Sequence, residues 1–108
     1  METIRKGNYV ILVVDTDLVA DDAIMTFKAK LTDIIATDEK DIILDFGNVR
    51  AVSSSGIGKI LLLYKKLKEK KGSMGFVNLH PQIAELFDKL MFLDLFTVYA
   101  SANDIPAR

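Results

Sequence analysis

The sequence predicts a single α/β domain spanning residues 1–108, with a mixed sheet of four to five strands and about three to four helices packed mainly on one face. The chain has 108 residues, half of them hydrophobic, which is enough for one core and too few for a second domain. Apolar, β-branched runs alternate with amphipathic stretches after a hairpin-like start. This order indicates parallel strands joined by right-handed crossovers, with one antiparallel strand added.

The first half of the chain predicts two strands, a helix and a third strand. Residues 9–14 form an apolar run between turn-forming residues, which predicts a buried strand, and residues 3–6 can pair with it as a short hairpin partner. Asp21 and Asp22 suit the positive end of a helix dipole, and apolar residues follow at helical spacing to about Thr37. Residues 41–46 are short and uniformly apolar, which is typical of a central strand.

The second half predicts two helices and two short strands. Residues 59–71 predict a helix that is closed by Gly72 as its C-cap. Residues 75–79 and 96–100 predict strands. Pro81 suits the first turn of a further helix, in which one face is formed by Ile83, Leu86, Phe87 and Leu90. The six phenylalanines lie in or against these elements, so we expect them to pack in the core.

Composition narrows the classes of function. With 14 basic and 15 acidic residues, the chain lacks the net basic surface of a general nucleic-acid binder. It has no cysteine and a single histidine, His80, so we expect no disulfide, no thiolate or histidine-rich metal site and no cofactor. No apolar run approaches the ~20 residues that cross a bilayer, and the N-terminus lacks a signal pattern. We therefore expect a cytoplasmic protein without membrane insertion.

The charges are unevenly placed although their sum is only −1. Six basic residues lie within 59–71, whereas ten of the fifteen acidic residues lie at or before Asp45. We interpret the lysine run as a solvated helix end that complements the helix dipole, with an acidic partner or a lipid headgroup as the alternative. Four acidic residues lack the spacing of a calcium loop, and we assign them to a turn and a helix start: Asp15, Asp17, Asp21 and Asp22.

Three adjacent serines, Ser53 to Ser55, precede Gly56-Ile57-Gly58 and the second helix. A serine at a helix start commonly caps a backbone N–H group two or three residues further on. The same N–H groups and the helix dipole also favour an anion, and glycines leave room for it, so one of these serines could carry a phosphate. The residues alone leave both interpretations open.

No enzyme motif is complete around these serines. The P-loop spacing is absent, and Leu61 stands where a dinucleotide-binding loop would need its third glycine. The glycine-x-serine-x-glycine elbow is also missing, and we expect His80, the only imidazole, to cap a helix or lie at the surface. We therefore predict that the chain is not an enzyme and has no catalytic residue; a small hydrolase using Ser54 or Ser55 is the weakest hypothesis, because no base can be named.

Residues 42–61 resemble the signature of the STAS family, to which the anti-sigma factor antagonists belong. That signature is an apolar strand ending in Asp or Asn, a short loop, then Asp-Ser-Ser/Thr-Gly-Leu-Gly and a helix. The similarity extends over nearly the whole chain and includes residues 86–88 and 93–96. It implies a STAS-like fold with the element order given above.

In that family the serine directly after the motif's aspartate is phosphorylated by a partner that is both a serine kinase and an anti-sigma factor. The resemblance places this acceptor at Ser54, with Ser53 and Ser55 less favoured. It implies that the unphosphorylated chain, a monomer or weak dimer, binds the anti-sigma factor and frees a sigma factor, and that phosphorylation ends the binding. A serine phosphatase is a further candidate partner. The implied partner-binding residues are Ser53, Ser54, Ser55, Gly56, Ile57, Gly58 and Leu61.

The chain departs from the family pattern in two places. The motif's aspartate is replaced by Ser53, and residues 16–19 read Thr-Asp-Leu-Val where many relatives have Gly-x-Leu-Asp. Ser53 in place of the acid and the lysine run favour an alternative, a constitutive STAS scaffold within a signalling or lipid-transport assembly. On the second helix, Leu61 and Leu62 widen the apolar arc, and we expect them in the core, with partner contact as the alternative.

Overall fold

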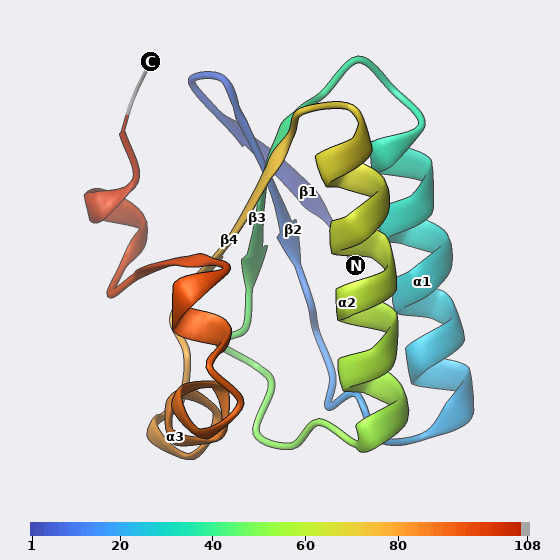
Figure 1. Cartoon of the computed structure of the whole chain (residues 1–108), viewed down its shortest axis with the longest axis vertical. Coiled ribbons are helices and arrows are strands. Elements are labelled where there is room, and N and C mark those ends of the chain that lie inside the picture. Colours follow the sequence, from blue (N-terminus) through green and yellow to red (C-terminus); the bar gives the residue numbers. More distant parts are fainter. Residues whose placement is uncertain (107–108) are drawn as a thin grey trace.

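A five-stranded sheet in the order β1-β2-β3-β4-β5 organises the computed structural model, which describes residues 1–106 (Figure 1). β1 is antiparallel to β2, and the other neighbouring strands are parallel, so the sheet is mixed as predicted. The strands are β1 (Thr3–Lys6), β2 (Tyr9–Val13), β3 (Asp41–Asp45), β4 (Ser73–Val77) and β5 (Thr97–Tyr99). The helices are α1 (Asp21–Ile35), α2 (Ser54–Glu69) and α3 (Pro81–Lys89), with 3₁₀ turns η1 (Phe92–Asp94) and η2 (Ala102–Asp104).

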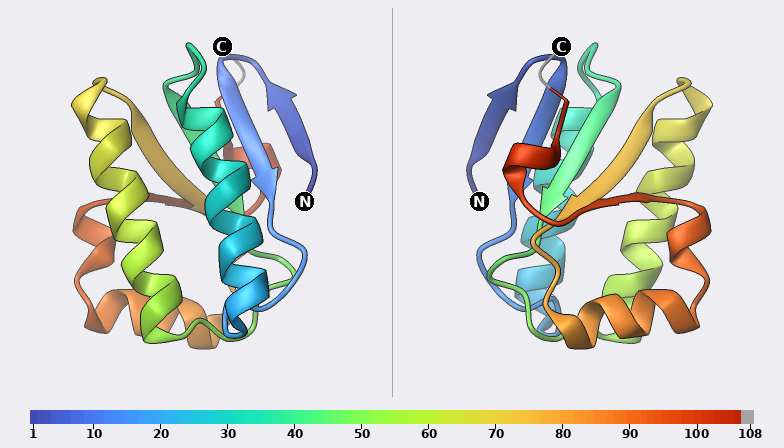
Figure 2. Two further views of the ribbon diagram at one scale, coloured as in Figure 1. Left: turned by 90° about the vertical axis from the view of Figure 1, so that its right-hand side faces the viewer. Right: turned by 90° about the vertical axis from the view of Figure 1, so that its left-hand side faces the viewer.

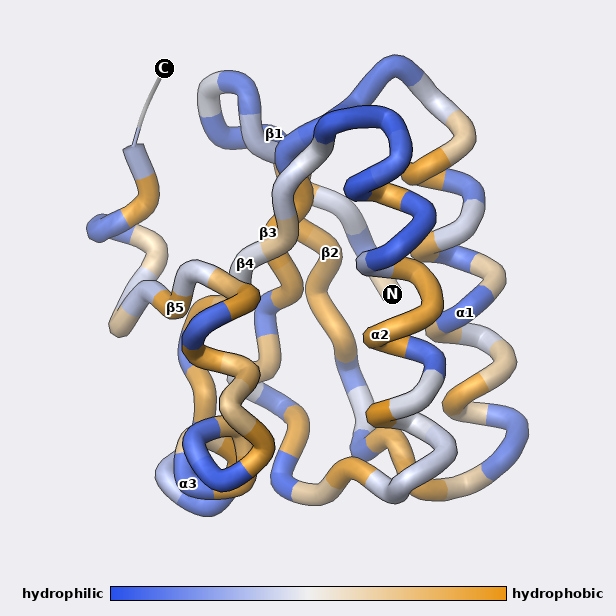
Figure 3. Tube along the Cα trace, in the orientation of Figure 1, coloured by the Kyte–Doolittle hydropathy of each residue, from blue (hydrophilic) through white to orange (hydrophobic). Residues whose placement is uncertain are grey.

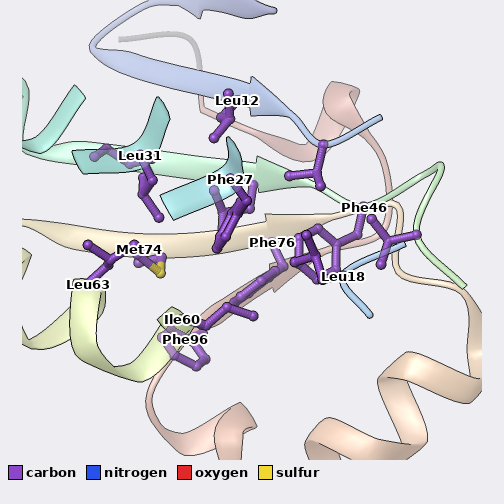
Figure 4. Packing of buried hydrophobic residues seen from close by; sticks show 14 of the residues in the cluster. Leu12, Leu18, Phe27, Leu31, Phe46, Ile60, Leu63, Met74, Phe76 and Phe96 are labelled. Atoms are coloured by element: carbon purple, nitrogen blue, oxygen red, sulfur yellow. The ribbon is translucent and has the colours of Figure 1, made fainter. Parts of the chain in front are cut away.

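α1 and α2 lie side by side on one face of the sheet, and α3 lies at the end of the sheet where the parallel strands finish (Figures 1 and 2). The main core fills the space between this face and the helices. It contains all six phenylalanines, several of which meet edge to face, as Phe46 and Phe76 do at 5.1 Å between ring centroids. Figure 4 shows Phe27, Leu31 and Leu63 from the two helices pointing toward the sheet residues of this cluster.

The opposite face of the sheet is covered by the C-terminal segment rather than by a helix. Ile105 packs on Ile11, Ile43 and Val77 in a second buried cluster. The segment that carries η2 crosses this face in Figure 2. β3 is consequently buried on both faces, which explains the uniform apolarity of its centre.

The second helix begins at Ser54, five residues earlier than predicted, because Ser53 caps it and both Gly56 and Gly58 are helical. Its C-terminal end also differs from the prediction. Lys71, not Gly72, adopts the left-handed conformation, with φ 63°, and the N–H groups of Lys71 and Gly72 close a Schellman motif on the carbonyls of Lys68 and Leu67. A Cβ on Gly72 would lie 2.5 Å from both Leu67 and the Lys40 carbonyl, so close packing explains this glycine.

The remaining elements lie within two residues of their predicted bounds, with β4 beginning at Ser73 instead of residue 75. Of the four residues predicted to form one face of α3, Leu90 lies just beyond the end of the helix. Ile83 and Phe87 are buried and Leu86 is half-buried, but Leu90 follows the last turn of α3 and is 43% exposed.

Candidate functional site

The serine loop, residues 46–53, joins β3 to α2 and runs alongside the loop between β2 and α1. Leu18 and Val52 form a parallel β-bridge, and the Ser53 N–H donates to the Leu18 carbonyl at 2.9 Å. The Arg50 N–H donates to the Asp17 carboxylate at 2.7 Å. These bonds hold two loops that are distant in sequence together as one surface at the end of the sheet (Figure 1).

Ser53 is the N-cap of α2. Its backbone is extended, and its half-buried hydroxyl accepts the Gly56 N–H at 3.2 Å. Serine and aspartate are among the residues that cap helices best, so Ser53 keeps the cap that the family's aspartate would provide and removes only the negative charge.

Ser54 and Ser55 are the first two residues of α2, and both are exposed. The N–H groups of a first helical turn have no partner within the helix, and together with the dipole they favour negative charge. The first turn of α2 contains no acidic residue. The structure thus separates Ser53, a capping residue, from two accessible hydroxyls at an end of a helix that favours an anion.

The two glycines of the motif have different roles. Gly56 is buried, and a Cβ there would lie 2.8 Å from the Leu18 carbonyl and 2.9 Å from Val52, so this glycine lets α2 approach the β2–α1 loop. It shapes the surface without being open to a partner. Gly58 is exposed, and a Cβ there would meet nothing within 4 Å.

The apolar residues of α2 divide between core and surface. Ile57 and Leu61 are half-buried and pack at the edge of the main core, which leaves part of each side chain open beside the serines. The prediction that Leu62 packs in the core is wrong, because this side chain is 42% exposed. Ser54, Ile57, Gly58 and Leu61 therefore share a surface that is partly polar and partly apolar.

An open depression of about 510 Å³ lies at the β2–α1 loop, one of the two paired loops. The β2–α1 loop and the start of α1 line it, and its lining includes Asp17 and Asp22 as well as the apolar residues Val19 and Ala23. Sequence reasoning missed it because Met1 joins residues 15–26 in its lining, and no local pattern brings these distant positions together. Asp21 and Asp22 occupy the first turn of α1 as predicted, and within residues 1–106 no three His, Cys, Asp or Glu side chains are grouped to hold a metal ion.

His80 occupies the N-cap position of α3, but its side chain does not cap that helix. Its Nε2 instead lies 2.7 Å from the Gly47 carbonyl oxygen, next to Asp45, which accepts hydrogen bonds from Gly47 N–H at 2.9 Å and Asn78 Nδ2 at 3.2 Å. These bonds tie the start of the serine loop to the end of β4. The imidazole has a structural role there, which gives no support to a serine hydrolase.

One residue of the lysine run, Lys70, has a structural role. Lys70 Nζ donates to the carbonyls of Ile35 at 2.7 Å and Thr37 at 2.5 Å, at the C-terminal end of α1. Lys66 and Lys68 are exposed in the last turn of α2, and the C-terminal end of this helix is largely hydrophilic in Figure 3. No helix in the described part of the chain has the length and apolarity needed to span a bilayer.

Known proteins resemble this chain both in sequence and in fold. The STAS domain family model matches residues 1–105. BtrV of Bordetella bronchiseptica, a candidate anti-sigma factor antagonist, is 31% identical over 80 residues, which cover 74% of this chain and 69% of BtrV.

Solved structures share the fold at low sequence identity. A candidate anti-sigma factor antagonist of Thermotoga maritima superposes with a TM-score of 0.84 at 15% identity, covering 95% of this chain and 88% of that one. The anti-sigma factor antagonist SpoIIAA in its unphosphorylated form gives 0.73 at 18% identity over 95% of this chain and 90% of SpoIIAA. The phosphorylated form of the Bacillus SpoIIAA gives 0.72 at 18% identity over 94% and 93%. The chain therefore belongs to the STAS domain family and resembles the anti-sigma factor antagonists within it.

Proposed function

We propose that this chain is an anti-sigma factor antagonist whose binding to its partner is ended by phosphorylation of Ser54. The observation that carries the proposal is the division of roles among the serines: Ser53 caps α2, while Ser54 is exposed in its first turn. The family motif assigns the acceptor to the same position. Ser55 is also exposed, so the motif rather than exposure selects Ser54.

The solved relatives support a switch that acts at the surface. SpoIIAA is known in unphosphorylated and phosphorylated forms, and both match the present fold almost equally, with TM-scores of 0.73 and 0.72. A phosphate on Ser54 would add about −1.5 to −2 charges at a helix N-terminus, where the dipole favours them. We therefore expect the modified chain to keep its fold.

The phosphate on Ser54 would weaken the binding of the partner. It would lie beside the half-buried apolar side chains of Ile57 and Leu61 and near the loop that carries Asp17. A partner docked on this surface would have to desolvate the new charge, which is costly unless the charge is paired. In this proposal the chain performs no chemistry of its own; it is the substrate of a cytoplasmic anti-sigma factor with serine-kinase activity, and a serine phosphatase restores binding.

Phosphate mapping by mass spectrometry after incubation with the cognate kinase and ATP tests the acceptor. Wild type and Ser55→Ala should carry one phosphate on Ser54, and Ser54→Ala should carry none. Unchanged phosphorylation of Ser54→Ala would rule Ser54 out.

A binding measurement tests the switch itself. The phosphorylated chain should bind the anti-sigma factor at least about tenfold more weakly than the unmodified chain, a loss of about 1.4 kcal/mol of binding free energy or more. Equal affinity of the two forms would favour the constitutive scaffold instead.

A further inference from the structure

Gly58 is a glycine that no contact within the domain explains. It lies inside α2, where glycine lowers the stability of a helix relative to alanine. Gly56 and Gly72 are buried against neighbouring atoms, but Gly58 is exposed, and a Cβ there would meet nothing within 4 Å. Glycine also lets the backbone of a binding partner approach closely. A partner that packs on α2 at Gly58 would account for this residue.

Outward-facing residues of α2 repeat at the spacing of a helix-packing seam. Ser54, Gly58, Leu61, Lys65 and Lys68 are separated by four, three, four and three positions, so they share one face of the helix. Leu61 is half-buried and the other four are exposed. We name Gly58, Leu61, Lys65 and Lys68 the α2 seam, and Ser54 lies at its N-terminal end. From Ser54 to Lys68 the helix rises about 21 Å, or about four turns.

The middle of the α2 seam is apolar. Leu61 is its apolar residue, and Leu62, the next residue of the helix, is 42% exposed. Tyr64 donates its hydroxyl to the Leu95 carbonyl at 3.3 Å, which holds Leu95 beside the helix, and Leu95 is 47% exposed. Exposed apolar side chains grouped in this way suit the apolar face of a partner helix.

The C-terminal end of the α2 seam is basic and has no ion pair. Lys65 and Lys68 are exposed, and within residues 1–106 neither forms a salt bridge with a carboxylate. Glu69, the only acidic residue of α2, comes four positions after Lys65, and this order favours a helical ion pair less than the reverse order does. Lys65 also lies before the last turn, where the helix dipole has little effect. Both lysines are therefore available to carboxylates of a partner.

We propose that the α2 seam binds a helix of the anti-sigma factor, with apolar residues of that helix on Leu61 and acidic residues opposite Lys65 and Lys68. The inference rests on the proposed function and extends its docking surface about four turns away from the acceptor serine. The surface is continuous with Ser54, so a helix seated on the seam would end beside the phosphate. Opposite charges at the lysine end would fix the direction and register of the bound helix.

An anionic bilayer is the other surface to which lysines are attracted. The chain as a whole has a net charge of −1, which gives it no overall attraction to such a bilayer. The α2 seam is also a single face of one helix, which is enough for a partner helix. The charge and the shape of this surface therefore favour the protein partner.

Titration calorimetry with the cognate anti-sigma factor tests the lysines. Lys65→Glu and Lys68→Glu should each weaken binding about tenfold or more, because an acidic side chain would then face acidic residues. Binding of the wild type should weaken as salt is added, and that dependence should be smaller for the two variants. Lys30→Glu is the matched control: it makes the same change of charge at an exposed position of α1 and should bind as the wild type does.

Gly58→Leu separates an interface role from a structural one. Its side chain would enter open space on a helix, so urea denaturation should show a chain at least as stable as the wild type. Binding of the anti-sigma factor should nevertheless weaken about tenfold. Carbodiimide cross-linking of the wild-type complex gives an independent measurement, because it joins ammonium groups to carboxylates in contact. Mass spectrometry should find Lys65 and Lys68 joined to Asp or Glu residues of the anti-sigma factor.

The outcomes separate this inference from the proposed switch. If phosphorylation of Ser54 weakens binding while Lys65→Glu, Lys68→Glu and Gly58→Leu bind as tightly as the wild type, the α2 seam is not the interface and the switch stands. A wild-type chain that does not bind the anti-sigma factor would overturn both. Vesicles of phosphatidylserine and phosphatidylcholine should not retain the wild type; retention that Lys65→Glu abolishes would assign the lysines to lipid and overturn the inference.

Discussion

At the scale of single residues, Ser53 accounts for the largest departure of this chain from the family motif. Its hydroxyl accepts the Gly56 N–H and so takes over a structural task that an aspartate can also perform. The replacement changes the charge beside Ser54 and leaves the start of α2 in place.

Ser53→Ala should lower the free energy of unfolding by about 1 kcal/mol, the usual cost of a lost N-cap. Urea denaturation measures this change. Ser53→Asp restores a capping oxygen and should unfold at nearly the wild-type urea concentration. If Ser53→Ala were as stable as the wild type, the cap would be unimportant for the fold.

The two motif glycines provide a second test at this scale. Gly56→Ala places a Cβ against the Leu18 carbonyl and should destabilise the chain by about 1–3 kcal/mol, since neither the start of α2 nor the β2–α1 loop can move away freely. Gly58→Ala meets open space in an exposed helix and should stabilise it by about 0.5–1 kcal/mol. Thermal or urea unfolding of the two variants should move in opposite directions; the same sign for both would contradict the assigned contacts.

At the scale of elements, a lysine that follows α2 caps the C-terminal end of α1. The last turn of α1 contains no basic residue, and Lys70, just after α2, bonds to the Ile35 and Thr37 carbonyls instead. A cation near the C-terminal end of a helix also opposes the negative end of its dipole. Two helices that are separated in sequence by the 18 residues 36–53 are thereby joined at one end.

Lys70→Met should cost about 1 kcal/mol, because two carbonyls lose a charged donor that is partly exposed to water. Hydrogen exchange should speed up for the amides in the last turn of α1 before it does elsewhere. Lys66→Met, on the exposed side of α2, is the control and should leave both stability and exchange unchanged. Equal effects of the two substitutions would argue against the cap.

At the scale of the whole molecule, two helices cover one face of the sheet and a short segment covers the other. Ile105 closes the second cluster over Ile11, Ile43 and Val77, and it is 2% exposed. The contribution of this one side chain is large relative to the 5–15 kcal/mol that stabilise a typical small domain.

Ile105→Ala should lower the free energy of unfolding by about 2–4 kcal/mol, and Ile105→Val by only about 0.5–1.5 kcal/mol. Ile4→Ala, on an exposed β1 position, should change it by no more than about 0.5 kcal/mol. Guanidinium denaturation of the three variants provides the comparison. A negligible effect of Ile105→Ala would mean that the C-terminal segment does not seal this face.

Phosphorylation would also change the net charge of the whole molecule. The net charge of −1 would become about −3 with one phosphate on Ser54, a large relative change concentrated at one helix start. Near neutrality is thus compatible with a switch that depends on a single added group.

The sequence by itself determined the α/β class, the order of the elements, the mixed sheet and the buried phenylalanines, because strand and helix periodicity are local properties of a chain. It also located the serine motif and its family. Only the tertiary structure decided which serine caps the helix, why Gly56 and Gly72 must be glycine, which apolar side chains stay exposed, and what covers the second face of the sheet. Each of those depends on atoms brought together from distant positions, such as Leu18 against Gly56 or Lys40 against Gly72, and no local pattern records such contacts.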